Sequence, residues 1–208
     1  MRYIVILSSL LFGAFAGQSQ EVEKNFKLGF TLSPNLSWVT NDGNNLAADG
    51  SKAGFSYGVL ADIGFAKNYF FSTAFTVTAL NSKAVRTGIS ADKYRLQFIE
   101  VPFTLKLKSN PTDQGRFYGQ FGLGTGINIS AKKDAESVGS NILVKDISIS
   151  SDVNTFRLGL IMGAGAEWNA GKNLTILTGL SFNNGFTKVF KDYDSRNPFI
   201  ALNLGVFF

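Results

Sequence analysis

RFYGQFGLGTGINIS, residues 116–130, alternates between large apolar side chains and small or polar ones. A period of two residues is that of a β-strand, whereas an amphipathic helix needs apolar residues at spacings of three and four. One face would carry Phe117, Phe121, Leu123, Ile127 and Ile129, and the other Gln120, Gly122, Gly124, Gly126, Asn128 and Ser130. The stretch therefore predicts a strand with one apolar face and one face of small polar residues.

Seven further stretches alternate in a similar way, which gives eight in total. They cover residues 25–38, 54–65, 69–80, 94–108, 154–168, 173–183 and 198–208. Short connections (66–68, 109–115 and 169–172) alternate with longer ones (40–53, 81–93, 131–153 and 184–197). An even strand number with short turns at one end and long loops at the other is typical of bacterial membrane barrels. The expected fold is an all-β, eight-stranded antiparallel up-and-down transmembrane barrel, whose last strand pairs antiparallel with the first.

The stretch 94–108 alternates twice, with its two halves out of phase. Tyr94, Leu96 and Phe98 share one parity, whereas the apolar residues from Ile99 onward share the other. A β-bulge near Phe98–Ile99 would restore one continuous apolar face, and Pro102 suits such an irregular position. We therefore expect a bulge in this strand.

The composition indicates that the apolar face meets lipid. Hydrophobic residues make up 45% of the 208 residues and charged residues only 17%, with 22 glycines and 20 phenylalanines. A soluble barrel would carry many Lys and Glu on its outer face, but the second face here is mostly Gly, Ser, Thr and Asn, which suit a narrow lumen. Aromatic residues near strand ends are expected to form interfacial girdles. They are Phe26, Trp38, Phe55, Phe65, Tyr94, Phe117, Phe156, Trp168 and Phe208.

The N-terminus reads as an export signal. Arg2 precedes an apolar run from Ile4 to Phe15, and Ala14-Phe15-Ala16 has the spacing of a cleavage site. The run is shorter than the ~20 residues that a membrane-spanning helix needs. We expect a signal peptide over 1–16, a short periplasmic segment over 17–25 and the barrel over 26–208.

Six charged residues have the parity of the lumen face. They are Lys27, Asp62, Glu100, Lys106, Arg157 and Glu167. Both signs are present, so a packed structural network is the first interpretation, and a gating or catalytic carboxylate is the alternative. We expect Arg157 to pair with Glu100, because an Arg facing lipid at mid-depth costs roughly 2–4 kcal/mol.

The absence of His and Cys excludes most catalytic and metal chemistry. Ser-His and Cys-His nucleophiles, His-containing metal sites, disulfides and thiolate chemistry are all ruled out. The net charge of +5 is dispersed, which disfavours nucleic-acid binding. We expect no enzyme activity, no catalytic residue, no metal ligand and no cofactor.

Several segments together resemble the PorT-like family of small outer-membrane β-barrel proteins. The resemblance rests on FIEVPFTLK (98–106), on the glycine-alternating segments 121–129 and 159–168, and on the terminal strand ending in Phe208. It implies a barrel fold and a location in the bacterial outer membrane, and one named member of the family is linked to a secretion apparatus. It implies no transferable site residues.

Three functions are compatible with these observations. The leading one is a structural or interaction role in the outer membrane, accessory to an envelope or secretion machine. A narrow pore for ions or small solutes is the second, and a membrane-embedded lipid-modifying enzyme is the third, disfavoured by the lack of His. The expected partners are outer-membrane lipid, the barrel-assembly machinery, which would read the C-terminal aromatic Phe208, and other envelope proteins.

Overall fold

The computed structural model describes residues 26–41, 47–86, 90–137, 143–171, 173–191 and 194–208. Within these ranges the regular structure consists of β-strands. The predicted signal peptide (1–16) and the predicted segment 17–25 lie outside the described residues. No helix in the described part of the chain is long and apolar enough to cross a membrane.

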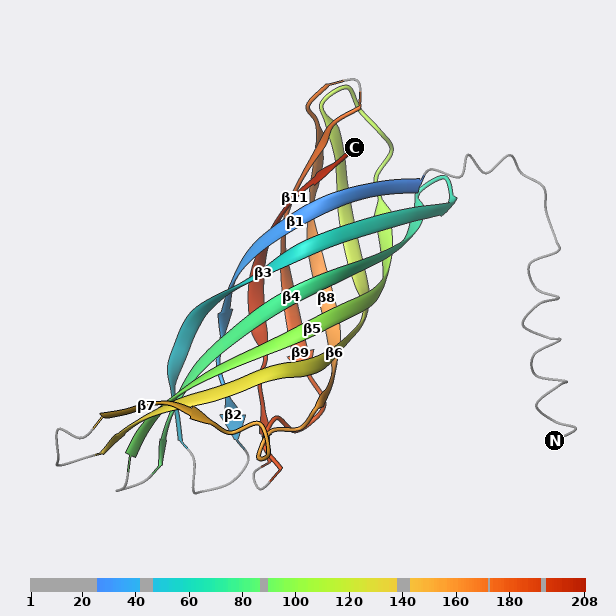
Figure 1. Cartoon of the computed structure of the whole chain (residues 1–208). Coiled ribbons are helices and arrows are strands. Elements are labelled where there is room, and N and C mark those ends of the chain that lie inside the picture. Colours follow the sequence, from blue (N-terminus) through green and yellow to red (C-terminus); the bar gives the residue numbers. More distant parts are fainter. Residues whose placement is uncertain (1–25, 42–46, 87–89, 138–142, 172, 192–193) are drawn as a thin grey trace, which may run out of the picture.

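Eight strands form a closed antiparallel barrel (Figure 1). They are β1 (Phe26–Ser37), β3 (Ala47–Ala66), β4 (Tyr69–Arg86), β5 (Ser90–Lys108), β6 (Gly115–Ser137), β8 (Phe156–Asn169), β9 (Thr175–Gly185) and β11 (Phe199–Phe207). Their order is β5-β4-β3-β1-β11-β9-β8-β6, and pairing of β5 with β6 closes the ring. The last strand pairs antiparallel with the first, from Gly29–Phe207 to Ser37–Phe199. The predicted fold is confirmed, and closure leaves no strand edge of the wall exposed to lipid.

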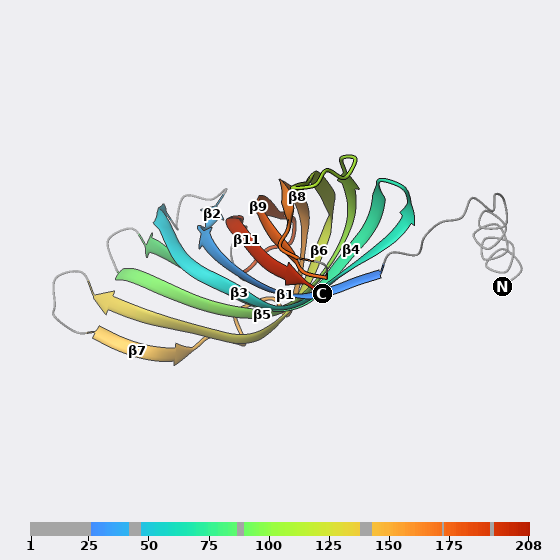
Figure 2. The same ribbon diagram turned by 90° about the horizontal axis from the view of Figure 1, so that it is seen from above.

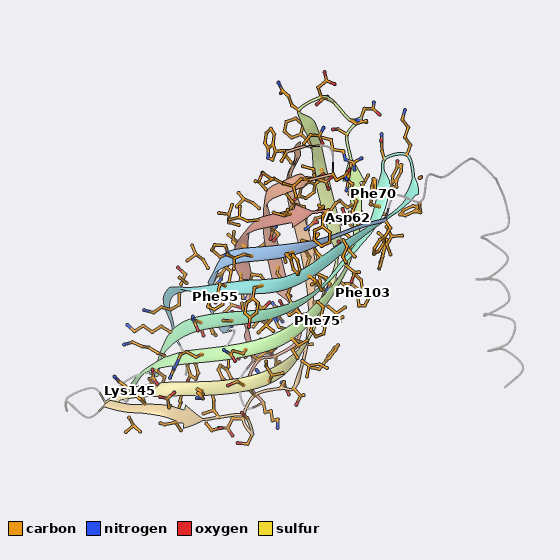
Figure 3. The ribbon with its side chains drawn as sticks, turned by 45° about the horizontal axis from the view of Figure 1, so that its top comes forward. Phe55, Asp62, Phe70, Phe75, Phe103 and Lys145 are labelled. Atoms are coloured by element: carbon orange, nitrogen blue, oxygen red, sulfur yellow. The ribbon has the colours of Figure 1, made fainter. Side chains whose placement is uncertain are left out.

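The two faces of the wall separate as the alternation predicted. Large apolar side chains stay exposed on the outside, including Phe30, Phe75, Phe121 and Leu180. Figure 3 shows Phe55, Phe75 and Phe103 on this outer surface. An exposed apolar surface of this extent is stable only against lipid. The expected girdle is wrong at Tyr94, whose side chain is buried inside the barrel.

The predicted bulge in the fourth alternating stretch is also wrong. β5 pairs with β4 without a shift through Thr78–Phe98, Val77–Ile99 and Thr76–Glu100. The irregularity lies on the partner β6, where Gln97 pairs with Ser130 and Phe98 with Asn128. Because β5 keeps its alternation, Leu96 and Phe98 point into the barrel.

One side of the barrel continues beyond the membrane-spanning wall. β3, β4, β5 and β6 are longer than predicted, and β7 (Leu143–Ser148) pairs with the far part of β6 inside the expected loop 131–153. Figures 1 and 2 show these strands projecting to one side of the barrel. On the opposite wall, β2 (Thr40–Asn41) and β10 (Ser195–Arg196) form a two-stranded sheet. We call this end of the barrel the long-loop end, and the end where β3 connects to β4, β5 to β6 and β8 to β9 the short-turn end.

Candidate functional site

Asp62 is the centre of a buried ionic cluster in the short-turn half of the lumen. Its carboxylate accepts hydrogen bonds from Lys106 Nζ at 3.0 Å and from Lys108 Nζ at 2.6 Å. The Ser72 hydroxyl donates a further bond at 2.6 Å. Asp62, Lys106 and Lys108 are almost completely inaccessible, so each charge depends on its partners rather than on water.

Glu167 extends this cluster across the lumen from β8. Lys108 Nζ lies 2.6 Å from its Oε1, and Arg116 Nε donates to its Oε2 at 3.2 Å. Lys27 Nζ lies 3.9 Å from the same Oε2. Lys108 therefore bridges the two buried carboxylates, Asp62 and Glu167. We call Asp62, Glu167, Lys27, Lys106, Lys108 and Arg116 the ionic plug.

Aromatic rings compensate for the excess of cations in the ionic plug. Lys108 Nζ lies 3.9 Å from the centre of the Phe70 ring, and Lys106 Nζ lies 5.0 Å from that of Tyr118. The buried Phe207 ring lies 5.5 Å from Lys106 Nζ. Ring faces attract cations, most strongly in a desolvated site. The four cations thus share two carboxylates and a set of aromatic faces.

Two glycines make room for Tyr118 in this half of the lumen. A Cβ at Gly165 would lie 2.7 Å from the Tyr118 hydroxyl, and one at Gly179 would clash with the same atom. These residues pair directly across β8 and β9. The Gly-rich inner face predicted from the sequence is therefore a space into which a large ring packs, rather than an open passage.

Arg157 and Glu100 form a second ionic group farther toward the long-loop end. Arg157 Nη1 donates to Glu100 Oε1 at 2.8 Å, as expected from the parity of the two residues. Its Nη2 donates to Asn183 Oδ1 at 2.9 Å and to the Asn197 carbonyl at 3.1 Å. The guanidinium carbon lies 5.2 Å from the centre of the Phe199 ring. The pair is buried, and both terminal nitrogens of Arg157 are hydrogen-bonded, whereas its buried Nε has no partner among the described residues.

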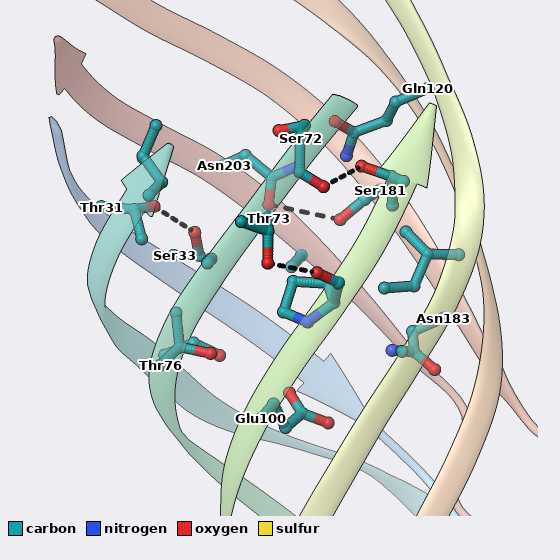
Figure 4. A pocket seen from close by; sticks show the side chains of 18 of the residues that line it. Thr31, Ser33, Ser72, Thr73, Thr76, Glu100, Gln120, Ser181, Asn183 and Asn203 are labelled. Carbon is teal, nitrogen blue, oxygen red and sulfur yellow. Dashed lines mark hydrogen bonds between the residues drawn. The ribbon is translucent and has the colours of Figure 1, made fainter. Parts of the chain in front are cut away.

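A small polar cavity separates the two ionic groups (Figure 4). Its volume is about 140 Å³, and its lining includes Ser72 and Lys106 on one side and Glu100 on the other. Most of the lining residues carry hydroxyl or amide groups, with Ser181 donating to Asn203 at 3.2 Å, and apolar atoms between them form the larger part of the accessible surface. A polar cavity of this size has room for several water molecules, since one water needs roughly 10–15 Å³.

Apolar side chains close the long-loop end. We call them the apolar plug: Val39, Leu80, Tyr94, Leu96, Phe98, Ala131, Ile149, Val153, Val189, Phe190, Phe199 and Ala201. The loop residues Val153 and Phe190 form a backbone bridge, and the Phe190 ring lies 4.9 Å from that of Tyr94. The loops on both sides of the mouth thus fold inward onto the end of the wall.

All six predicted lumen charges lie inside the barrel, in two groups. Asp62, Lys106, Glu167 and the partly exposed Lys27 belong to the ionic plug, and Arg157 pairs with Glu100. Sequence reasoning missed Lys108 and Arg116, although both share the parity of inward neighbours on their strands. Each lumen carboxylate has a cation partner, and no group of metal-ligating residues occurs among the described residues. This arrangement favours a packed network over acid–base chemistry.

Phe208, predicted to face lipid at the rim, is exposed at the end of β11, and its ring lies 5.7 Å from that of Phe30. Its neighbour Phe207 points the other way and is buried against the ionic plug. The two terminal aromatics therefore have different surroundings.

Comparison with known proteins supports a membrane barrel. The family model of the outer membrane protein beta-barrel domain matches residues 16–191. The chain is similar to the solved structure of Neisserial surface protein A, with 14% identity, a TM-score of 0.50, and coverage of 86% of this chain and 95% of that one. Ail of Yersinia pestis has 18% identity, a TM-score of 0.45, and coverage of 88% and 98%. OprG of Pseudomonas aeruginosa has 8% identity, a TM-score of 0.48, and coverage of 88% and 95%. No curated protein matches the chain.

Proposed function

Because this chain belongs to the outer membrane protein beta-barrel domain family and lies in the bacterial outer membrane, we propose that it is a non-conducting, non-enzymatic barrel with a structural and interaction role. The observation that carries the proposal is the double closure of the lumen. The ionic plug fills the short-turn half and the apolar plug fills the long-loop end. With the usual orientation of such barrels, these ends face the periplasm and the exterior, respectively.

Closure by two chemically different plugs opposes ion passage twice. In the ionic plug, a passing ion would have to displace side chains that satisfy one another at 2.6–3.0 Å. At the apolar plug it would have to leave water among mostly apolar side chains, which is strongly unfavourable for a charge. The polar groups buried there already bind one another: the Tyr94 hydroxyl donates to Asp92 at 3.2 Å, and Lys133 Nζ lies 3.8 Å from the same carboxylate. An eight-stranded barrel is in any case just wide enough to be filled by its own side chains.

The projecting sheet supports the interaction part of the proposal. The far ends of β3, β4, β5 and β6, together with β7, form this sheet beyond the lipid band. The outer edge of β7 pairs with no other strand in the described residues. Such an edge offers backbone donors and acceptors to a partner. The narrower PorT-like assignment, with a role accessory to an envelope or secretion machine, belongs to this proposal and places the partner among envelope proteins.

A narrow pore is the second candidate, and the polar cavity beside Glu100 and Lys106 is the observation that favours it. For conduction, both the ionic plug and the apolar plug would have to move. The cavity lies between these two plugs, so a cavity alone does not make a continuous path through the barrel.

Planar-bilayer recording tests the proposal. We expect the refolded wild-type barrel to insert, as judged by heat-modifiable migration, and to give no single-channel steps above the lipid background. A known wide porin, inserted under the same conditions, serves as the control for detection. Reproducible steps from the wild-type barrel would support the pore instead.

Co-purification tests the interaction arm. The full chain, solubilised from outer membranes in mild detergent, should retain an envelope protein that is lost when Val144 is replaced by Pro in β7. The matched control is Val206→Pro, which disrupts a wall strand rather than the projecting edge and should reduce the assembled barrel itself. If the wild-type chain and the Val144→Pro variant retained the same partner in equal amounts, the edge of β7 would have no role in binding it.

A further inference from the structure

The outer face of β4, β5 and β6 changes from apolar to cationic in successive cross-strand rows. Val77, Ile99 and Ile127 form one row, and the next outward-facing row is Ala79, Gln97 and Ser130. The following rows are Asn81, Arg95 and Lys132, then Lys83, Lys93 and Asp134. The change occurs within a few residues along each strand.

This change coincides with the outer limit of the lipid band. The exposed apolar residues of β6 extend from Phe117 to Ile129. At ~3.4 Å per residue and a tilt of ~40°, that distance spans roughly 30 Å across the membrane, which matches the hydrocarbon core. Lys132 and its row neighbour Arg95 therefore lie at the depth of the lipid headgroups on the long-loop side.

A groove lies at the same height on the outside of the barrel. Its volume is about 300 Å³, and it is lined by Phe55, Ala79, Asn81, Arg95, Leu96, Gln97, Ser130 and Lys132. Two irregularities coincide with it: β3 shifts register against β4 between Ser51 and Phe55, and β6 shifts against β5 beside Gln97. Bulges bend a sheet locally, so the projecting part leaves the wall at an angle and creates a concave line.

The charges around the groove are arranged at a cost to the fold. Arg95 lies directly opposite Lys132, and Lys83 directly opposite Lys93. Like charges in opposite cross-strand positions destabilise a sheet. Arg95 Nη2 contacts Asp134 at 2.8 Å and Asp146 at 2.9 Å, and Lys132 Nζ lies 3.6 Å from the same Asp146 oxygen, which offsets part of this repulsion. The exposed Lys93 in the next row adds a further positive charge beside them.

The combination of groove, depth and charge points to one class of ligand. Arg95 and Lys132 are about half exposed, with relative side-chain exposures of 45% and 50%, so the donors that Asp134 and Asp146 leave unused are accessible. A guanidinium fork with an adjacent ammonium group suits a phosphate. The exposed Phe55 ring and the Gln97 and Asn81 amides in the same groove suit the apolar and hydroxyl-bearing faces of a sugar.

We propose that this groove binds the phosphorylated sugar headgroup of an outer-leaflet glycolipid, with the phosphate held by Arg95 and Lys132. Its acyl chains would then run along the apolar rows below, beside Ile99 and Ile127. This inference assigns a lipid partner to the outer surface and does not depend on whether the lumen conducts.

Lipid binding tests the proposal with the refolded full barrel in detergent micelles, where single lipid molecules can reach the outer wall. The probes are bisphosphorylated lipid A, dephosphorylated lipid A and phosphatidylglycerol, each titrated in the same detergent and detected on the barrel by native mass spectrometry, with inorganic phosphate as a competitor. We expect saturable binding to lipid A that weakens at least tenfold without its phosphates and falls with rising salt. Phosphatidylglycerol should bind at least tenfold more weakly, and millimolar inorganic phosphate should compete poorly because it lacks the sugar.

The Arg95→Gln/Lys132→Gln variant should reduce lipid A affinity at least tenfold. The control Lys67→Gln/Lys188→Gln removes two exposed cations remote from the groove and should leave binding within twofold of wild type. Both variants must first show wild-type heat-modifiable migration, since Arg95 and Lys132 lie outside the lumen network. Equal losses in the two variants, unchanged binding in the groove variant, or equal binding to phosphatidylglycerol would overturn the proposal. Failure of the conductance experiment would leave it unaffected.

Discussion

The two ends of the lumen are closed by opposite means. The short-turn half uses buried charges that the wall strands themselves provide, with Lys108 bridging Asp62 and Glu167. The long-loop end uses apolar residues, several of which come from loops, such as Val153 and Phe190. A seal built on the wall cannot open without breaking the barrel, whereas a seal built partly on loops can move while the barrel stays folded. The two ends should therefore respond differently to substitution.

The largest loss of stability should follow Lys108→Met. It removes the cation between two buried carboxylates and leaves both under-compensated, which typically costs about 3–5 kcal/mol. Urea unfolding of the refolded barrel in lipid vesicles would measure the free energy of unfolding. Lys67→Met, at an exposed turn, is the matched control and should change it by less than about 0.5 kcal/mol. Similar values for the two variants would mean that the ionic plug contributes little to stability.

The charged residues of the short-turn half were largely predictable, because they follow the alternation of residues along the strands. Asp62, Lys106 and Glu167 alternate with lipid-facing residues, and a lumen is the one place where such charges can lie. Lys108 and Arg116 follow the same rule, but they sit at strand ends, where sequence boundaries are uncertain. The pairing of Arg157 with Glu100 followed from the same parity.

The long-loop end could not be predicted in the same way. Val153, Val189 and Phe190 lie in connections with no alternation, and Ile149 ends a stretch that alternates only over Ile147 to Ser150, so nothing local indicates that they fold back into the mouth. In β5, the apolar residues Leu96 and Phe98 have the parity of the lumen face. They predicted a bulge because the lumen face was expected to be polar. The loops cover these side chains, which removes the reason for a bulge on that strand.

Glu100→Leu should have the next largest effect, a loss of about 2–3 kcal/mol, because Arg157 keeps Asn183, the Asn197 carbonyl and the Phe199 ring. The double variant Glu100→Leu/Arg157→Met should recover most of that loss, since replacing a whole buried pair with apolar groups is often neutral. Urea unfolding of the two variants and of wild type provides the comparison. No recovery in the double variant would indicate that the pair itself, rather than its desolvation, stabilises the barrel.

Phe190→Ala should be milder, at about 1–2 kcal/mol. A fully buried Phe in a rigid core would cost about 3–5 kcal/mol, but here the loop can leave the mouth, so local opening limits the loss. Limited proteolysis of intact cells should detect the opening as faster cleavage of the external loops. Phe186→Ala, an exposed residue near the same loop, should not accelerate cleavage.

Substitutions of the two terminal aromatic residues should affect assembly and stability separately. Deleting Phe207 and Phe208 is expected to lower the amount of protein in the outer membrane while signal-peptide cleavage stays intact. Phe208→Ala alone should reproduce the loss of assembly with little change in unfolding free energy, because Phe208 is exposed. Phe207→Ala should instead lower stability, because its ring packs on the ionic plug. Heat-modifiable migration in outer-membrane fractions gives the assembled amount, and normal amounts for the truncation would contradict this role of the terminus.

Thiol labelling of the central cavity tests the double closure most directly. The sequence contains no cysteine, so Ser181→Cys in the cavity wall would provide the single reactive thiol of the chain. A membrane-impermeant maleimide should label Lys145→Cys, on the exposed projecting sheet, from outside, and Ser109→Cys, at an exposed turn, only after permeabilisation. Closure at both ends predicts that Ser181→Cys stays unlabelled under both conditions and becomes labelled from outside when Phe190→Ala is added. Labelling of Ser181→Cys alone at the rate of either exposed control would contradict a lumen sealed at both ends.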